Sequence, residues 1–203
     1  MEGRPSAVAT VRAHPATSRT LHPCFNAPTR PAPGVVVGLG NTILSDDGVG
    51  PHVVSRISPA LALHPELECV ELSLGGLALL DVLRDRRWAV LVDCLDTGDS
   101  PPGTIRRLSE RDVRGSARLV SYHDLSYPMA LRMGRVLGWS LPTDVVIIGI
   151  EGRNVNEFGS TMSPVVERAC DRAARIVEGE IERRIRAGPP GGGSRDGPLR
   201  NTE

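Results

Sequence analysis

The chain contains no lysine, and all 24 of its basic residues are arginine. This absence excludes sites in which a lysine amine does the chemistry: a lysine-bearing phosphate loop, a Schiff-base lysine and a lysine general base. The 24 arginines are balanced by 24 acidic residues, so the formal net charge is zero. Without a basic cluster, the chain lacks the electrostatic surface that nucleic acids and anionic membranes require, and we expect neither as a partner.

Aromatic residues and paired cysteines are also scarce. Aromatics make up 3% of the chain and hydrophobic residues 40%, so the core has to be built from Val, Leu, Ile and Ala, which favours buried parallel strands. The four cysteines are far apart and form no C-x-x-C pair: Cys24, Cys69, Cys94 and Cys170. We therefore expect reduced thiols in a cytoplasmic protein. No apolar run approaches the roughly 20 residues that span a bilayer.

The two ends of the chain differ in composition from its middle. Residues 1–33 are rich in Pro, Ala, Thr and Arg and lack apolar periodicity, which predicts a disordered N-terminal extension. Their acid-poor composition resembles an organelle-targeting peptide and equally fits a wrongly assigned start codon. The glycine-rich residues 188–203 predict a flexible tail. One domain is expected between them, over residues 34–187.

Within this domain, short apolar runs alternate with amphipathic segments. The runs that predict strands are 34–39, 66–72, 88–95, 103–108 and 144–150. The segments that predict helices begin near Gly50, span 77–86 and 124–138, and end with a long helix that Ser163 caps and Pro164 opens. This alternation predicts an α/β fold, a three-layer sandwich with a mostly parallel, five-stranded sheet flanked by helices.

Polar residues that follow the predicted strands are candidates for chemistry, because ligands bind at the carboxyl ends of parallel strands. Asp93 lies among Val and Leu, where an unpaired charge would cost several kcal/mol, so its position indicates a function. Asp46 and Asp47 follow the first strand, and acids at a helix N-terminus are their structural alternative. His123 precedes the helix predicted over 124–138, and a structural or capping histidine is the alternative there.

Asp47, Asp93 and His123 have a joint interpretation. Two carboxylates and one imidazole suit Zn, Ni, Co or Mn. Three protein ligands also leave coordination positions open for water or a substrate group. The sequence therefore predicts that these three side chains gather around one divalent metal at the carboxyl ends of the strands.

The string GLGNTILSDDGVG at 38–50 resembles the N-terminal signature of the nickel–iron hydrogenase maturation endopeptidases, G-x-G-N-x-L-x-x-D-[DE]-x-x-G. The resemblance covers residues 34–187 and continues through further motifs in the same order: Gly75 and Gly76, Asp93, Ser-Tyr-His at 121–123, Gly-Ile-Glu at 149–151 and Met-Ser-Pro at 162–164. Two positions depart from the family pattern, since Asp124 stands where Gln is frequent and Gly152 where Pro is common. Both departures bear on which hydrogenase large subunit is accepted.

The resemblance implies a cytoplasmic endopeptidase that removes a C-terminal extension from the precursor of a hydrogenase large subunit after nickel insertion. The family's metal contacts map onto Asp47, Asp93 and His123. The metal is expected to be the substrate's own nickel, with another divalent metal such as Zn able to substitute, and no catalytic group is identified beyond these ligands. Asn41, Gly75 and Gly76 are candidate substrate contacts, and for the two glycines a bare turn is the alternative.

Three other functions share some of these sequence features. A dinucleotide site needs a third glycine at position 43, where the chain has Ile43. A signalling receiver domain also has an acid pair and a third-strand Asp, but it needs a lysine that this chain lacks. A non-catalytic metal-binding or partner-binding α/β module related to these proteases is the remaining alternative.

Overall fold

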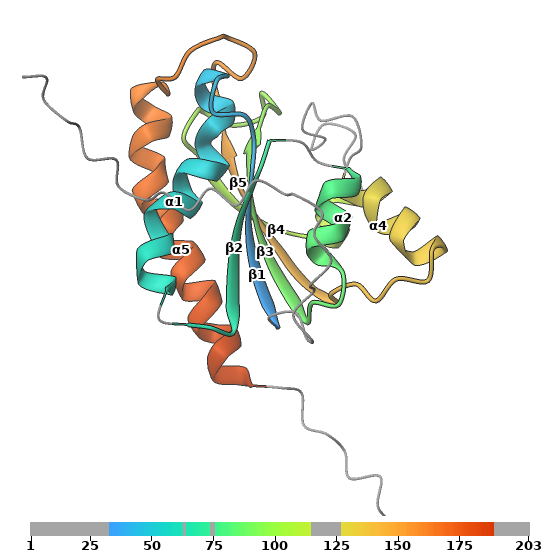
Figure 1. Ribbon diagram of the computed structural model, residues 1–203. Helices are drawn as coiled ribbons and strands as arrows, with labels where there is room; N and C mark the ends of the chain where they lie inside the picture. The colour runs from blue at the N-terminus through green and yellow to red at the C-terminus, as the bar shows by residue number, and fades with distance from the viewer. Residues whose placement is uncertain (1–32, 63, 74–75, 115–126, 189–203) are drawn as a thin grey trace, which may run out of the picture. The chain divides into compact units, whose positions relative to one another are not determined.

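The computed structural model describes residues 33–188, except for 63, 74–75 and 115–126. Five strands form one sheet in the order β2-β1-β3-β5-β4 (Figure 1). The strands are β1 (Gly34–Leu39), β2 (Leu67–Leu72), β3 (Trp88–Leu95), β4 (Ile105–Ser109) and β5 (Asp144–Glu151). β1 runs parallel to β2 and β3, and β3 runs parallel to β5; among these described strands, β4 at the edge is the antiparallel one. The predicted five-stranded, mostly parallel sheet is confirmed.

Helices cover both faces of this sheet. The helical elements are the 3₁₀ turn η1 (Ser45–Gly48), α1 (Val49–Leu61), α2 (Leu77–Leu83), α3 (Glu110–Arg114), α4 (Tyr127–Val136) and α5 (Pro164–Ala187). α1 and α5 pack together on one face, and α2 and α4 pack together on the other (Figure 1). The predicted three layers are thereby confirmed. Within the described ranges, no helix is both long and apolar enough to cross a membrane.

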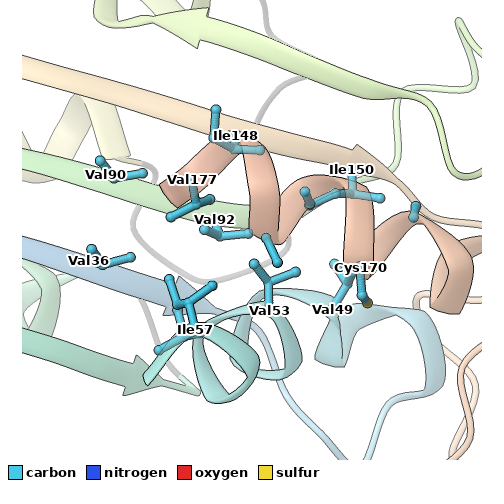
Figure 2. Packing of buried hydrophobic residues seen from close by; sticks show 14 of the residues in the cluster. Val36, Val49, Val53, Ile57, Val90, Val92, Ile148, Ile150, Cys170 and Val177 are labelled. Atoms are coloured by element: carbon cyan, nitrogen blue, oxygen red, sulfur yellow. The ribbon is translucent and has the colours of Figure 1, made fainter. Parts of the chain in front are cut away.

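The core consists of two apolar layers separated by the sheet. Every residue of β1 and of β3 is buried, as expected of strands covered on both sides. Figure 2 shows part of the layer between the sheet and helices α1 and α5, formed by Val36, Val90, Val92, Ile148, Val53, Ile57 and Val177. The opposite layer joins alternate residues of β1 and β3 to α2 and α4: Val35, Val37, Leu91, Leu79, Leu83 and Leu131. β3 is therefore held from both sides over its whole length.

The element boundaries differ from the sequence prediction at a few points. α2 ends at Leu83 instead of residue 86, because Arg84 is extended and Asp85 has a φ of 61°. β4 begins at Ile105 rather than at 103, and α4 ends at Val136 rather than at 138. The elements η1 and α3 were not expected. Nearly all of the predicted disordered extension and of the predicted tail lies outside the described residues, so both stay predictions.

An ion-pair network ties α5 to β4 and β5 at the end of the sheet where β5 begins. The Arg184 side chain is 3% exposed, and its Nη1 and Nη2 donate to Glu180 Oε2 at 2.6 Å and Asp144 Oδ1 at 2.7 Å. Its guanidinium carbon also lies 5.6 Å from the centre of the Trp88 ring. Glu180 additionally accepts hydrogen bonds from Arg107 and Arg183, at 2.6 Å each. Glu180 thus accepts hydrogen bonds from three guanidinium groups, and Asp144 shares one of these, that of Arg184.

Glu180→Gln is expected to lower the free energy of unfolding by about 1–3 kcal/mol near neutral pH, because it removes the charged acceptor of a buried arginine. Burial alone would raise the pKa of Glu180, but the hydrogen bonds from Arg107, Arg183 and Arg184 outweigh it and lower this pKa from 4.5 to about 2. The stabilisation is therefore complete above pH 4.5 and is lost as the pH falls towards 2.

Urea unfolding at pH 7 and pH 3 measures this difference. Glu182→Gln is the matched control, because Glu182 pairs with Arg186 while both side chains are exposed, at 65% and 75%. Equal effects of the two substitutions at pH 7 would contradict the prediction.

Candidate active site

The carboxyl ends of β1 and β3 meet the start of α1 at one edge of the sheet. Gly50, in the first turn of α1, packs so closely there that an added Cβ would lie 2.2 Å from the Leu39 carbonyl oxygen and 2.6 Å from that of Val92. Asp47 precedes Gly50 by three residues, and Asp93 directly follows Val92. The close contact therefore brings the segments of both predicted ligands to the same edge.

Asp47 is held by a tight turn. Its side chain is largely buried, with the residue 7% exposed, and its Oδ2 accepts the Asn41 backbone N–H at 2.7 Å. The turn is closed by Leu44 N–H donating to Asn41 O at 3.0 Å and by Asp47 N–H donating to Leu44 O at 2.8 Å. At its start, Gly40 has a φ of +130°, and a Cβ there would lie only 1.9 Å from Asp47 O. The backbone thus fixes where the Asp47 carboxylate lies.

Asn41 shapes this turn in the structure. Besides its backbone bond to Asp47, its Oδ1 accepts the Ile43 N–H at 3.2 Å. Such an Asx-type bond stabilises a turn without any ligand. Substrate contact by Asn41 stays a prediction.

Asp93 lies near the end of β3 and is 8% exposed. Side chains alternate along a strand, so Asp93 lies on the face of Leu91, towards α2 and α4, whereas Cys94 packs in the layer with α1 and α5. Burial raises the pKa of the Cys94 thiol, and the charges of Asp93, Asp47 and Asp46 raise it further. The raised pKa disfavours the thiolate form of Cys94 at neutral pH, which argues against this thiol as a nucleophile.

The buried carboxylate of Asp46 has a structural role. Asp46 is 0% exposed, and its Oδ1 accepts the Ser163 N–H at 2.6 Å. Its Oδ2 accepts the N–H groups of Arg153 at 2.9 Å and Asn154 at 3.0 Å and the Ser163 hydroxyl at 2.9 Å. Burial alone would raise the Asp46 pKa, but these donors together hold it below its ordinary value. Since Asp46 binds backbone groups with both oxygens, it joins η1 to the β5–α5 connection, and Asp47 is favoured as the ligand of the pair.

Ser163 lies where the sequence predicted it, at the N-cap position of α5. Its hydroxyl donates to Asp46 and makes no capping hydrogen bond to α5, so the predicted side-chain cap is wrong. Its carbonyl oxygen accepts the N–H groups of Val166 and Glu167, at 3.0 Å each. The serine therefore attaches α5 to the loop that bears Asp47.

Glu151 is a site-shaping residue that the sequence reasoning missed. It is 2% exposed, and its Oε1 accepts the backbone N–H groups of Thr97 and Gly98, at 2.8 Å each. The Thr97 hydroxyl lies 2.9 Å from both carboxylate oxygens. Glu151 thereby orders the segment that leaves β3 next to Asp93. An acid at the end of the apolar run VVIIGIE is the same signal that singled out Asp93, and it would have identified Glu151.

The remaining predicted site residues are only partly described. His123 and Gly75 lie outside the described residues, so the structure does not test their roles. Gly76 is buried at the N-cap position of α2 with a φ of 71°, a conformation that favours glycine, and its contact with substrate stays a prediction. Over the part of the chain that the structure describes, no three His, Cys, Asp or Glu side chains form a metal-binding group. Of the three predicted ligands, Asp47 and Asp93 are described, and two carboxylates at one edge of the sheet are a donor set that suits a divalent cation.

Gly152, which stands where the resembling family commonly has proline, packs tightly in this structure. Its N–H donates to Leu95 O at 2.8 Å, a bond that proline cannot make. A Cβ at this position would lie 2.6 Å from Cys94 Sγ and 2.7 Å from Val155 Cγ1. The local packing thus explains why this chain has glycine here.

Gly152→Ala is expected to lower the free energy of unfolding by about 1–3 kcal/mol through overpacking. Gly159→Ala is the control in the same β5–α5 connection, because a Cβ there would meet nothing within 4 Å. Urea unfolding of both variants measures the difference. If Gly152→Ala is as stable as Gly159→Ala, the neighbouring side chains move aside without cost and the prediction is wrong.

Comparisons with known proteins agree with this architecture. The sequence pattern of the family described as hydrogenase maturation protease matches residues 51–180. The chain is 28% identical over 153 residues to a putative hydrogenase maturation protease of Methanocaldococcus jannaschii, covering 73% of this chain and 96% of that protein. It is 25% identical over 145 residues to the hydrogenase expression/formation protein HupD of Thiocapsa roseopersicina, covering 70% of this chain and 65% of that protein.

The fold also matches a solved structure. The hydrogenase maturating endopeptidase HybD from Escherichia coli superposes with a TM-score of 0.64 at 22% identity, covering 74% of this chain and 92% of that one. This likeness shows the fold alone, and the family pattern shows the relationship. The chain belongs to the hydrogenase maturation protease family.

Proposed function

We propose that the chain is an endopeptidase that removes a C-terminal extension from the nickel-loaded precursor of a nickel–iron hydrogenase large subunit, in the cytoplasm. The observation that supports this most is the pair of largely buried carboxylates, Asp47 and Asp93, at one edge of the sheet in a chain of this family. The names of the relatives, which refer to hydrogenase maturation and to hydrogenase expression or formation, agree with it.

In the proposed reaction, the metal is part of the substrate. Asp47 and Asp93, completed by His123, act as additional ligands of the nickel already bound in the precursor, and so hold the adjacent peptide bond in one place. A divalent ion held there can polarise the scissile carbonyl or activate a water molecule. The rigid turn at Asp47 and the buried strand at Asp93 favour this role, because ligands on fixed supports lose little freedom when the substrate arrives.

The isolated protein is expected to bind nickel and zinc weakly, because the precursor supplies the rest of the coordination shell. Elemental analysis after dialysis of the purified protein against metal-free buffer measures this. We expect well under one metal ion per chain. Tightly bound, stoichiometric metal in the purified protein would contradict the proposal that the substrate supplies the metal, and would indicate a resident metal.

Coexpression with the precursor tests the proposed activity directly. The expression host is a strain that lacks other hydrogenase proteases. Mass spectrometry measures the length of the large subunit. We expect loss of the tail only when nickel has been inserted. If the loaded precursor keeps its tail while a known processing protease removes it, the enzymatic proposal fails. Binding of the precursor without cleavage would then identify the non-catalytic, partner-binding alternative.

A further inference from the structure

Two large apolar side chains are exposed on the loops beside Asp47. Ile43 is 58% exposed and lies in the turn between Asn41 and Asp47. Phe158 is 86% exposed and lies in the β5–α5 connection, and it is one of only two phenylalanines in the chain. Exposing such side chains to water is unfavourable, and their placement at a binding edge is typical of a protein contact.

The two loops are joined by backbone hydrogen bonds. Gly159 N–H donates to Ile43 O at 3.0 Å, and Ser45 N–H donates to Gly159 O at 2.8 Å. Leu44 and Gly159 form the corresponding parallel bridge. Figure 1 shows the orange connection between β5 and α5 beside the blue segment that leads into α1. Ile43 and Phe158 thus project from one connected support, which we call the Ile43/Phe158 surface.

Asp46 makes this support rigid. Its carboxylate holds Arg153 and Asn154 at the start of the β5–α5 connection and Ser163 at its end. The connection is therefore attached to η1 on both sides of Phe158. A surface that is ordered before binding loses little conformational entropy when a partner covers it, which increases affinity.

We infer that the Ile43/Phe158 surface docks an apolar segment of the precursor polypeptide, next to the metal that Asp47 contacts. This inference rests on the proposed function. The occupant follows from continuity: Ile43 and Asp47 belong to the same turn, so a protein that presents its metal to Asp47 also reaches Ile43 and, across the bridge, Phe158. A metal ion is too small to cover both side chains, whereas an extended apolar segment of a polypeptide can cover them.

Phe158→Ser combined with Ile43→Ser tests this inference in the full-length protein. The apolar contacts at such a surface are expected to contribute to binding and not to the chemical step. We therefore expect KM for the nickel-loaded precursor, and Kd in a separate binding measurement, to rise by about tenfold or more. We expect kcat to stay within about twofold of the wild-type value, and urea unfolding to be unchanged, since the side chains are exposed.

Val136→Ser is the matched control, because Val136 is 88% exposed at the last residue of α4. We expect this variant to leave KM and Kd unchanged. An unchanged KM in the double variant, or an equal rise with Val136→Ser, would overturn the inference. So would a wild-type dimer in size-exclusion chromatography that Phe158→Ser converts to a monomer, since the surface would then bind a second copy of the chain.

Separate binding and cleavage measurements distinguish this inference from the proposed function. If the wild type and the double variant both remove the tail with the same KM, the protease function stands and the docking surface is refuted. If the wild type binds the precursor through Phe158 but never cleaves it, the docking surface stands and the protease function is refuted. If the wild type neither binds nor cleaves, both are refuted.

Discussion

Asp93→Asn is expected to abolish tail removal, with a loss of at least about 100-fold in the rate of processing, because a neutral amide is a poor ligand for a divalent metal. Asparagine has nearly the shape of aspartate, so the sheet around β3 should stay intact. His123→Ala is expected to have a comparable effect if His123 completes the site. Mass spectrometry of the large subunit measures processing, and circular dichroism measures the fold.

Asp81→Asn is the control for loss of one negative charge, because Asp81 is exposed on α2. This variant should process the precursor at the wild-type rate. A collapse of the circular dichroism spectrum in both Asp93→Asn and His123→Ala would instead assign these two residues to the stability of the fold. Full activity of Asp93→Asn would remove Asp93 from the site.

Gly40→Ala has the largest expected effect on stability, a loss of about 2–4 kcal/mol, together with loss of processing in the fraction that still folds. Two costs combine at this position. Its φ of +130° is strained for any residue with a side chain, and the added Cβ would lie 1.9 Å from the Asp47 carbonyl oxygen. The turn that fixes the Asp47 carboxylate therefore has to move.

The variant Gly138→Ala distinguishes the cost of backbone strain from the cost of the steric contact. Gly138 also has a positive φ, of +70°, but a Cβ there would meet nothing within 4 Å, so only the backbone cost of about 1 kcal/mol remains. Urea unfolding and precursor processing are measured for both variants. Equal losses of stability would mean that the contact with Asp47 adds nothing at Gly40.

The sequence predicts the sheet well because its strands are short apolar runs covered on both faces. The apolar runs 34–39 and 88–95 predict strands with the bounds that the structure shows. The end of α2 could not be predicted, because it depends on the backbone at Asp85, whose N–H donates to the distant Ser140 carbonyl at 2.8 Å. Local propensity contains no information about such a partner.

Some features of the candidate site can likewise be predicted from the sequence, and others cannot. The burial of Asp93 follows from its apolar neighbours alone, and its role as a metal ligand stays a prediction. The motif indicates Asp47 rather than Asp46 as the metal ligand, but it contains no structural reason for this choice. The structural reason is that the Asp46 carboxylate already binds residues far along the chain, namely Arg153, Asn154 and Ser163. The three-ligand metal site itself stays a prediction, because His123 lies outside the described residues.

These long-range bonds of Asp46 also bear on when the site can be completed during translation. The turn that bears Asp47 is synthesised early, but Ser163, which helps to fix it, leaves the ribosome 117 residues after Asp46. Until then, neither the Asp47 carboxylate nor the Ile43/Phe158 surface has its final support. A nascent chain that stops short of α5 lacks the bonds from Ser163, so the proposed recognition of the precursor requires nearly all of the domain to be synthesised.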